Sequence, residues 1–185
     1  MPDKIKPGEQ LNATIEEWKP TDPETDKDFF EKVVPQLQAI KGRHLRDLAT
    51  RRPGFSEESI QKSLGYLEKR LRALKSGDTV PMARAGGSII GYILVRWDDG
   101  ENREQIEQFC VDIPYRDRGV GTKLLVRAME RARNARPGES EGIFLTTGEM
   151  NEGAQRLYGR WGFHQSDIPA DDEGEVRLEL DFEAR

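Results

Sequence analysis

A pair of glycines at the start of a predicted helix is the feature of this chain with the clearest chemical meaning. The apolar run at 106–113 predicts a strand that leads through a tight turn into a helix beginning near Val120. The first turn of a helix has N–H groups without intrahelical partners and carries the positive end of the helix dipole, and glycine lets a ligand approach the backbone. The arrangement indicates an anion site, most often for phosphate, and Arg116 and Arg118 add positive charge beside it.

The spacing at this turn excludes two common phosphate motifs. A dinucleotide fingerprint needs a third glycine three residues after Gly121, where the chain has Leu124. A Walker A loop needs Gly-Lys followed by Ser or Thr, whereas the order here is Gly121-Thr122-Lys123. Two interpretations stay open from this motif alone: a phosphate site of another kind, or a tight strand-to-helix connection without a ligand.

Two motifs together resemble the GNAT superfamily of N-acetyltransferases. The pattern Arg-x-x-Gly-x-Gly at 116–121, preceded by Val111 and by Pro114-Tyr115, looks like the acetyl-CoA signature of that superfamily. Its Asn-x-x-Ala-x-x-Leu-Tyr-x-x-x-Gly-Phe pattern is matched by Asn151, Ala154, Leu157, Tyr158, Gly162 and Phe163. A predicted helix and strand separate the two motifs, as in the superfamily, and the resemblance covers roughly residues 80–165.

The resemblance implies acetyl-CoA as co-substrate, no metal, and a set of contacts. In such proteins the pyrophosphate lies on the glycine turn, the pantetheine arm runs beside the preceding strand, and the Asn and Tyr of the second motif lie near the arm and the sulfur. The cofactor-binding residues expected on this basis are Val111, Ile113, Arg116, Arg118, Gly119, Val120, Gly121, Thr122, Asn151 and Tyr158.

Attack of an amine on a thioester requires three catalytic groups. The developing oxyanion needs a donor, for which the backbone N–H of Val111 is the candidate. The leaving thiolate needs a proton, which a tyrosine hydroxyl such as that of Tyr158 can supply, since its pKa is about 10. The amine, with a pKa of about 10.4, must first lose a proton. Glu107, expected to share a strand face with Phe109, is the candidate base, and Glu104 is the alternative; both carboxylates are equally compatible with solvated strand-edge charges.

Several of these residues also have a purely structural interpretation. Tyr158 lies on the apolar stripe of its predicted helix, and Asn151 stands where a helix N-cap is expected. Cys110 is typical of a small buried apolar residue, and no motif supports a Cys-His pair with His164. With His44 as the only other histidine, the chain shows no metal-ligand cluster.

The apolar pattern of the first half predicts the elements that must support the turn. A strand with imperfect alternation is expected at 11–18, and a helix at 28–51 is kinked or begins at Pro35. A second helix follows an N-cap at Ser56 and stops by Gly77. Two β-rich runs around Gly86-Gly87 predict a hairpin, which the strand at 106–113 extends into an antiparallel meander.

The second half alternates helix and strand, with helices expected at 120–132 and 154–161 and strands at 143–147 and 176–182. This order implies a partly parallel sheet. The fold class expected is α/β (α+β), with a mixed, mostly antiparallel central sheet of about six or seven strands flanked by helices, as in GNAT proteins. Residues 1–10 are expected to form a flexible N-terminus, and residues 11–185 a single acyl-CoA N-acyltransferase-like domain.

Composition restricts the class of protein. A net charge of −5 argues against general nucleic-acid binding, because nothing supplies a basic field along a phosphate backbone. One cysteine excludes an internal disulfide framework. The longest apolar stretch, 89–95, is too short to cross a bilayer, and the start has no apolar signal segment. A cytoplasmic protein that does not act at a membrane is therefore expected.

Two functions follow from the sequence. The leading hypothesis is an N-acetyltransferase that passes the acetyl group of acetyl-CoA directly to a primary amine in a ternary complex. The alternative is a non-catalytic acyl-CoA-binding sensor or interaction module of the same fold; the presence of both Asn151 and Tyr158 favours the enzyme. A small cationic amine is favoured over a protein acceptor, since an acidic run at 167–175 would attract a cation if it bordered the cleft. A homodimer paired through edge strands stays an open alternative.

Overall fold

A seven-stranded mixed sheet forms the centre of the structure, a computed structural model that describes residues 11–20, 23–51, 56–135, 139–149, 151–168 and 174–182. The predicted flexible N-terminus at 1–10 lies outside these residues. The strands are β1 (Thr14–Trp18), β2 (Val80–Ala85), β3 (Ser88–Asp98), β4 (Arg103–Val111), β5 (Gly142–Gly148), β6 (His164–Gln165) and β7 (Glu175–Asp181). Their order in the sheet is β1-β2-β3-β4-β5-β7-β6, and among these neighbours only β4 and β5 pair in parallel. The predicted fold class is confirmed.

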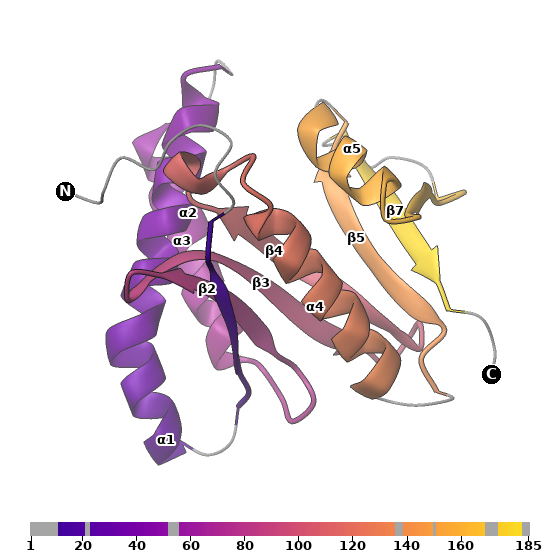
Figure 1. The fold of residues 1–185 in the computed structure, drawn as a ribbon, viewed down its shortest axis with the longest axis horizontal. Helices are drawn as coiled ribbons and strands as arrows, with labels where there is room; N and C mark the ends of the chain where they lie inside the picture. The colour runs from indigo at the N-terminus through magenta and orange to yellow at the C-terminus, as the bar shows by residue number, and fades with distance from the viewer. Residues whose placement is uncertain are drawn as a thin grey trace.

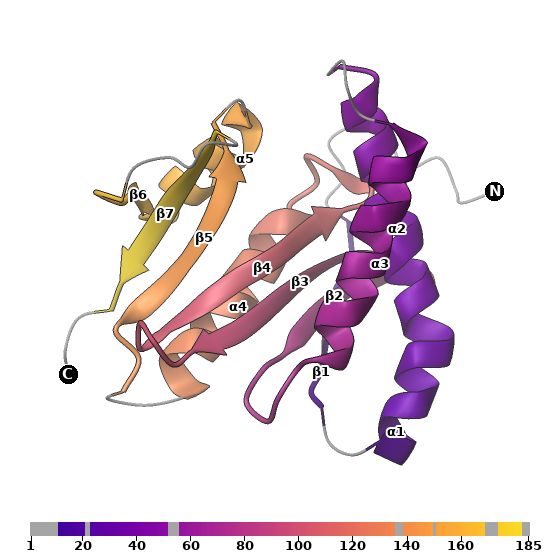
Figure 2. The ribbon, with the colours of Figure 1, turned by 180° about the vertical axis from the view of Figure 1, so that it is seen from behind.

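Helices cover both faces of this sheet (Figures 1 and 2). They are α1 (Pro23–Asp28), the π-helix η1 (Phe29–Val33), α2 (Val34–Ala49), α3 (Glu57–Arg72), the 3-10 helix η2 (Ile113–Tyr115), α4 (Val120–Ala135) and α5 (Glu152–Gly159). The α2–α3 layer buries Leu37, Leu67 and Leu71 in one core cluster, whereas α4 buries Leu124 and Leu125 in the other. Each such side chain contributes about 1.5–3 kcal/mol, so both layers are firmly held against the sheet.

Local sequence signals account for where the first helices begin. Ser56 is the N-cap of α3, as predicted, and its hydroxyl accepts a hydrogen bond from the Ser59 N–H at 3.1 Å. Pro35 lies in the first turn of α2, directly after the π-helix η1, and the chain is helical without a gap from Pro23 to Ala49. The helix therefore does not begin at Pro35; the irregularity near the proline is the π-helical segment that precedes it. Helix α3 ends at Arg72, earlier than the predicted stop at Gly77.

Two strands differ from the sequence prediction. The hairpin of β2 and β3 turns at Gly86-Gly87 as predicted, with both glycines at positive φ. Strand β4 begins at Arg103, before the expected residue 106, because the preceding turn extends to Asn102 at a φ of 50°. Strand β6 was not predicted, since two residues are too short to show alternation.

Strands β4 and β5 separate part of the way along the sheet, and this split positions the functional site. Their parallel pairing runs only from Arg103–Gly142 to Ile106–Leu145. Beyond Ile106 the two strands diverge (Figure 2). The register of β4 on β3 shifts here, from Ile106 opposite Val95 to Gln108 opposite Leu94, which leaves Glu107 as an extra residue. Such a β-bulge bends its strand and disrupts the local ladder, which accounts for the split.

Candidate active site

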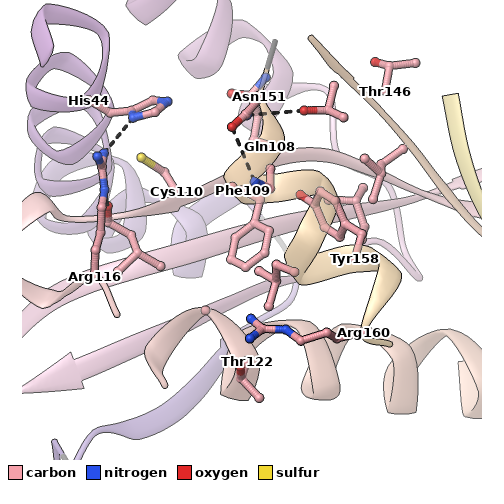
Figure 3. Close-up of a pocket in the computed structure, with 18 of the residues that line it drawn as sticks. His44, Gln108, Phe109, Cys110, Arg116, Thr122, Thr146, Asn151, Tyr158 and Arg160 are labelled. Carbon is pink, nitrogen blue, oxygen red and sulfur yellow. Dashed lines mark hydrogen bonds between the residues drawn. The ribbon is translucent and has the colours of Figure 1, made fainter. Parts of the chain in front are cut away.

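A pocket of about 660 Å³ lies in the split and continues to the first turn of α4 (Figure 3). We name its two sides by the helices that face them. The α4 wall contains Phe109, Val111, Gly119, Gly121, Thr122, Leu157, Tyr158 and Arg160. The α2–α3 wall contains His44, Glu107, Gln108, Cys110 and Arg116. The predicted glycine turn and the second predicted motif are therefore brought together at one site.

The open edge of β4 supplies backbone groups to the pocket. The Asp112 N–H donates to the Ile90 carbonyl on β3 at 2.8 Å. Since backbone groups alternate in direction along an antiparallel strand, those of Phe109 and Val111 point the other way, into the split. The Val111 N–H is thus placed where a ligand in the split can accept from it, and the Val111 carbonyl accepts from Arg116 Nε at 3.2 Å.

The glycine turn leaves the first N–H groups of α4 available to a ligand. Gly119 has a φ of 77°, a conformation that glycine adopts at no steric cost. Its carbonyl accepts from the Lys123 N–H at 3.0 Å, the first α-helical bond, so the preceding N–H groups of Val120, Gly121 and Thr122 have no partner within the helix. At the positive end of the helix dipole, these N–H groups are available to bind an anion.

Gly121 also keeps the adjoining part of the pocket open between apolar side chains. A Cβ at this position would lie 3.5 Å from the Phe109 ring, 3.6 Å from Leu157 and 3.8 Å from Val111. An anion site that adjoins a narrow apolar channel and an open strand edge fits the phosphates, aliphatic segments and amides of a CoA molecule. The site residues present therefore fit that group.

Some of the expected cofactor-binding residues contribute no side chain to the pocket lining. Val120 is buried in the core, Ile113 is 38% exposed, and Arg118 is half-buried outside the lining. We therefore expect these three residues to contact the cofactor through their backbone groups alone. The Asn151 side chain lines the pocket and caps α5, since its Oδ1 accepts from the Ala154 N–H at 3.4 Å, so the structural interpretation of this residue is confirmed.

Arg116 directs its side chain toward α2. Its Nη2 lies 2.7 Å from His44 Nδ1, and its Nη1 lies 3.3 Å from Asp47 Oδ2. The guanidinium is thus bound by protein groups on the α2–α3 wall. Arg160, which the sequence reasoning missed, is exposed at the end of α5, and Figure 3 shows it pointing toward Thr122. Arg160 follows Tyr158 by two residues within the second motif, and this position could have marked it as a candidate site residue.

Tyr158 lies inside the pocket, packed against Phe109 and Phe163 with ring centroids 6.2 and 5.6 Å away. Only 5% of the residue is exposed, and Figure 3 shows its hydroxyl directed into the pocket. Burial raises the pKa of this hydroxyl above its ordinary value. The group therefore stays protonated at neutral pH and is available as a proton donor.

The two candidate bases have very different surroundings. Glu107 reaches the pocket, and its side chain is 7% exposed. Its carboxylate binds Arg70 of α3 through both oxygens and accepts from Arg96 Nη1 at 2.6 Å. Glu104 is 2% exposed, lies in the part of β4 flanked by both neighbouring strands, and does not line the pocket.

The expectation that Glu107 shares a face with Phe109 is wrong. Phe109 packs against the core cluster under α4, whereas Glu107 contacts α3 on the other side of the sheet. The cause is the β-bulge, because one extra residue interrupts the alternation of side chains along the strand. The catalytic carboxylate, if Glu107 supplies it, therefore approaches from the α2–α3 wall.

Two buried groups on the side of the sheet that α2 and α3 cover, Cys110 of the pocket lining and Lys41 of α2, have strongly shifted pKa values. Burial raises the pKa of the Cys110 thiol to about 12 and lowers that of the Lys41 ammonium to about 8. Cys110 is thus a protonated thiol at neutral pH, and His164 does not line the pocket. A Cys-His nucleophile is not assembled from these residues.

Comparison with known protein families identifies the class. A model of the acetyltransferase (GNAT) family matches residues 43–163, about two thirds of the chain. The chain therefore belongs to the GNAT family and is an acetyltransferase by class. The matched region includes α4, the glycine turn, β5 and α5. No curated protein sequence gives a significant match.

Solved structures show the same fold. PH1933 from Pyrococcus horikoshii OT3 superposes with a TM-score of 0.67 at 22% identity, over 92% of this chain and 99% of that one. The PaiA N-acetyltransferase of Thermoplasma acidophilum, in complex with coenzyme A, gives 0.65 at 17% identity, over 91% and 99%. A Bacillus anthracis protein assigned as a streptothricin acetyltransferase, in complex with acetyl coenzyme A, gives 0.52 at 28% identity, over 58% and 64%.

The described residues contain neither a membrane-spanning helix nor a cluster of metal ligands. Within the segments given above, no helix combines the length and the apolar character needed to cross a membrane. The same segments contain no group of three or more His, Cys, Asp or Glu that could hold a metal ion. The expectation of a metal-independent reaction stays a prediction.

Proposed function

We propose that the protein transfers the acetyl group of acetyl-CoA directly to a primary amine in a ternary complex. The observation that carries the proposal is the split between β4 and β5, where the open edge at Val111 and the Tyr158 hydroxyl meet beside the N-terminus of α4. The proposal is supported because a backbone N–H, a buried hydroxyl and the first N–H groups of a helix adjoin one pocket, as an oxyanion donor, a proton donor and an anion site would.

The chain's own residues have separate roles in this proposal. The first N–H groups of α4 bind the pyrophosphate, and Arg160 adds charge beside it. The open edge of β4 orients the pantetheine amides, and the Val111 N–H donates to the carbonyl oxygen as negative charge develops there. Tyr158 gives a proton to the leaving sulfur. No covalent attachment to the protein is needed.

Glu107 is our proposed proton acceptor, acting through a water molecule. It is the candidate carboxylate that lines the pocket, whereas Glu104 does not. Arg70 and Arg96 donate hydrogen bonds to its oxygens, so a bridging water carries the proton from the amine to the carboxylate. Arg70 and Arg96 fix the position of its carboxylate on the α2–α3 wall.

The preference for a particular acceptor, which rests on the acidic run at 167–175, stays a prediction. A small cationic amine is proposed over a protein acceptor, but residues 169–173 of the acidic run lie outside the described residues. The cytoplasmic location and the homodimer stay predictions too; β1 and β6 are the two edge strands of the sheet.

Calorimetric titration with acetyl-CoA, followed by an assay of amine-dependent CoA release, tests the proposed function. We expect micromolar binding and release of CoA that depends on the amine. Binding without release for any amine of a broad panel would favour the alternative, a non-catalytic acyl-CoA-binding module. Absence of binding would reduce the glycine turn to a structural connection.

A further inference from the structure

The imidazole of His44 forms part of the α2–α3 wall and has no role in the reaction as proposed so far. The residue is half-buried on α2, and Figure 3 shows its ring directed into the pocket, with one nitrogen toward Arg116 and the other away from it. The phosphates of the cofactor are proposed to lie at α4, on the other face of the sheet. An acceptor that approaches the thioester from the side opposite the phosphates therefore passes the α2–α3 wall.

The contact with Arg116 determines which nitrogen of His44 carries the proton. Arg116 Nη2 lies 2.7 Å from His44 Nδ1, and a guanidinium can only donate. His44 Nδ1 must therefore accept, and the proton of the neutral ring is on Nε2. Arg116 is itself fixed by the Val111 carbonyl at 3.2 Å and by Asp47 at 3.3 Å, so two further contacts hold the donor in place.

The charge state of the ring agrees with this geometry. Burial first, and then the positive charge of Arg116, lower the pKa of His44 to about 4. The ring is thus neutral at pH 7. Its lone pair on Nδ1 is already used, which excludes His44 as the general base in this arrangement.

What remains is a hydrogen-bond donor facing the pocket. Among the described residues, the His44 ring is bonded through Nδ1, and no bond from Nε2 is found. An accessible donor that faces the pocket favours a ligand that brings an acceptor atom, since such a hydrogen bond contributes about 0.5–1.5 kcal/mol.

We propose that His44, held by Arg116 as the Nε2–H tautomer, binds an oxygen atom of the acceptor, so that amines carrying a hydroxyl or carboxylate oxygen are preferred to plain alkyl amines. The inference rests on the proposed transferase function and extends it to the class of acceptor. Arg116 acts as a positioning residue here, since it orients His44 without touching the acceptor.

Nitrogen NMR of protein labelled at histidine tests the tautomer without any need for turnover. The chain has two histidines, and a His164→Gln variant assigns their signals. We expect His44 to show a protonated Nε2 and an unprotonated Nδ1 at neutral pH. In Arg116→Met the preference should be lost. A protonated Nδ1 in the unaltered protein would overturn the proposal.

Three amines of equal chain length test the selectivity: butylamine, aminobutanol and aminobutanoate. With acetyl-CoA present, His44→Phe should raise KM for the oxygen-bearing amines about tenfold, as expected for one lost hydrogen bond, and leave butylamine unchanged. His44→Gln, which keeps a donor, should restore most of the loss. The alcohol and the carboxylate show which oxygen the site prefers. Equal changes for all three amines, or a weaker affinity for acetyl-CoA in His44→Phe, would overturn the proposal.

For amines that are not turned over, the same selectivity can be tested by their binding to the protein–CoA complex, followed through the NMR signal of His44. The Nε2 signal of His44 should move more with aminobutanol or aminobutanoate than with butylamine. Equal shifts would overturn the inference while leaving the transferase function intact. Conversely, a failure to bind acetyl-CoA counts against the proposed function, and the tautomer is still measured independently.

Discussion

The two walls of the pocket present different kinds of groups to a ligand. The α4 wall offers mainly backbone N–H groups and apolar surface, from the glycine turn and the open edge of β4. The α2–α3 wall offers side chains bound in ion pairs and hydrogen bonds, such as Glu107 with Arg70 and His44 with Arg116. Backbone groups are present whatever the side chains, whereas side-chain networks change with single substitutions. The comparison suggests that the first wall recognises a shared cofactor and the second selects the acceptor.

The largest effect should come from closing the α4 wall. Gly121→Glu places bulk and negative charge where phosphate is proposed to lie, and we expect acetyl-CoA binding to fall by more than about 100-fold. Calorimetry with acetyl-CoA measures the change. Gly65→Glu, the same substitution at an exposed helical glycine with open space around it, is the matched control. Normal binding by Gly121→Glu would mean that the cofactor lies elsewhere.

Removal of the Tyr158 hydroxyl should separate binding from chemistry on the same wall. Tyr158→Phe keeps the packing on Phe109 and Phe163, so the affinity for acetyl-CoA should hardly change, while kcat falls about 10³-fold through loss of the proton donor. Steady-state kinetics beside calorimetry gives both values. If kcat is retained, another group protonates the sulfur.

Glu107→Gln tests whether the α2–α3 wall takes part in proton transfer. We expect kcat to fall about 10²-fold, at the low end for a general base, because two guanidinium groups already occupy the carboxylate. Glu68→Gln, which removes an exposed partner of Arg72 on α3, is the control. A lower melting temperature with unchanged kcat would instead assign Glu107 a structural role.

Arg160→Ala should weaken acetyl-CoA binding about fivefold, since an exposed cation near phosphate contributes about 1 kcal/mol that salt screens. The difference from the unaltered protein should shrink as ionic strength rises. Arg156→Ala is the control, because that exposed arginine pairs with Glu152. An effect independent of salt would argue against a direct charge contribution on the α4 wall.

The last prediction concerns stability and pH rather than binding or rate. His44 has a pKa of about 4 in the folded protein, below the ordinary value of about 6.5 for the unfolded chain. Between these values the unfolded state binds the extra proton, so this residue lowers stability as the pH falls from about 6.5 to 4. Thermal melts should show a shallower decline in His44→Gln over that window. Identical slopes would mean that the ring is not held in its neutral form.

The sequence predicted the parts of the site that depend on neighbours along the chain. The glycine turn, helix α4, the N-caps at Ser56 and Asn151 and the helix–strand order of the second half follow from short spacings and local preferences. These are properties of a few consecutive residues, so the amino acids alone were sufficient. The same motifs identified the family to which the chain belongs.

Only the tertiary structure decided which side chains meet across the pocket. The bulge at Glu107 moved that carboxylate to the opposite face from Phe109, and the closed part of the sheet kept Glu104 out of the lining. Arg116 meets His44 although 72 residues separate them. Strand register and helix docking set such contacts through burial across the whole core, and no local pattern encodes them. The sequence by itself therefore determined the glycine turn and the fold class, whereas packing decided the composition of the α2–α3 wall.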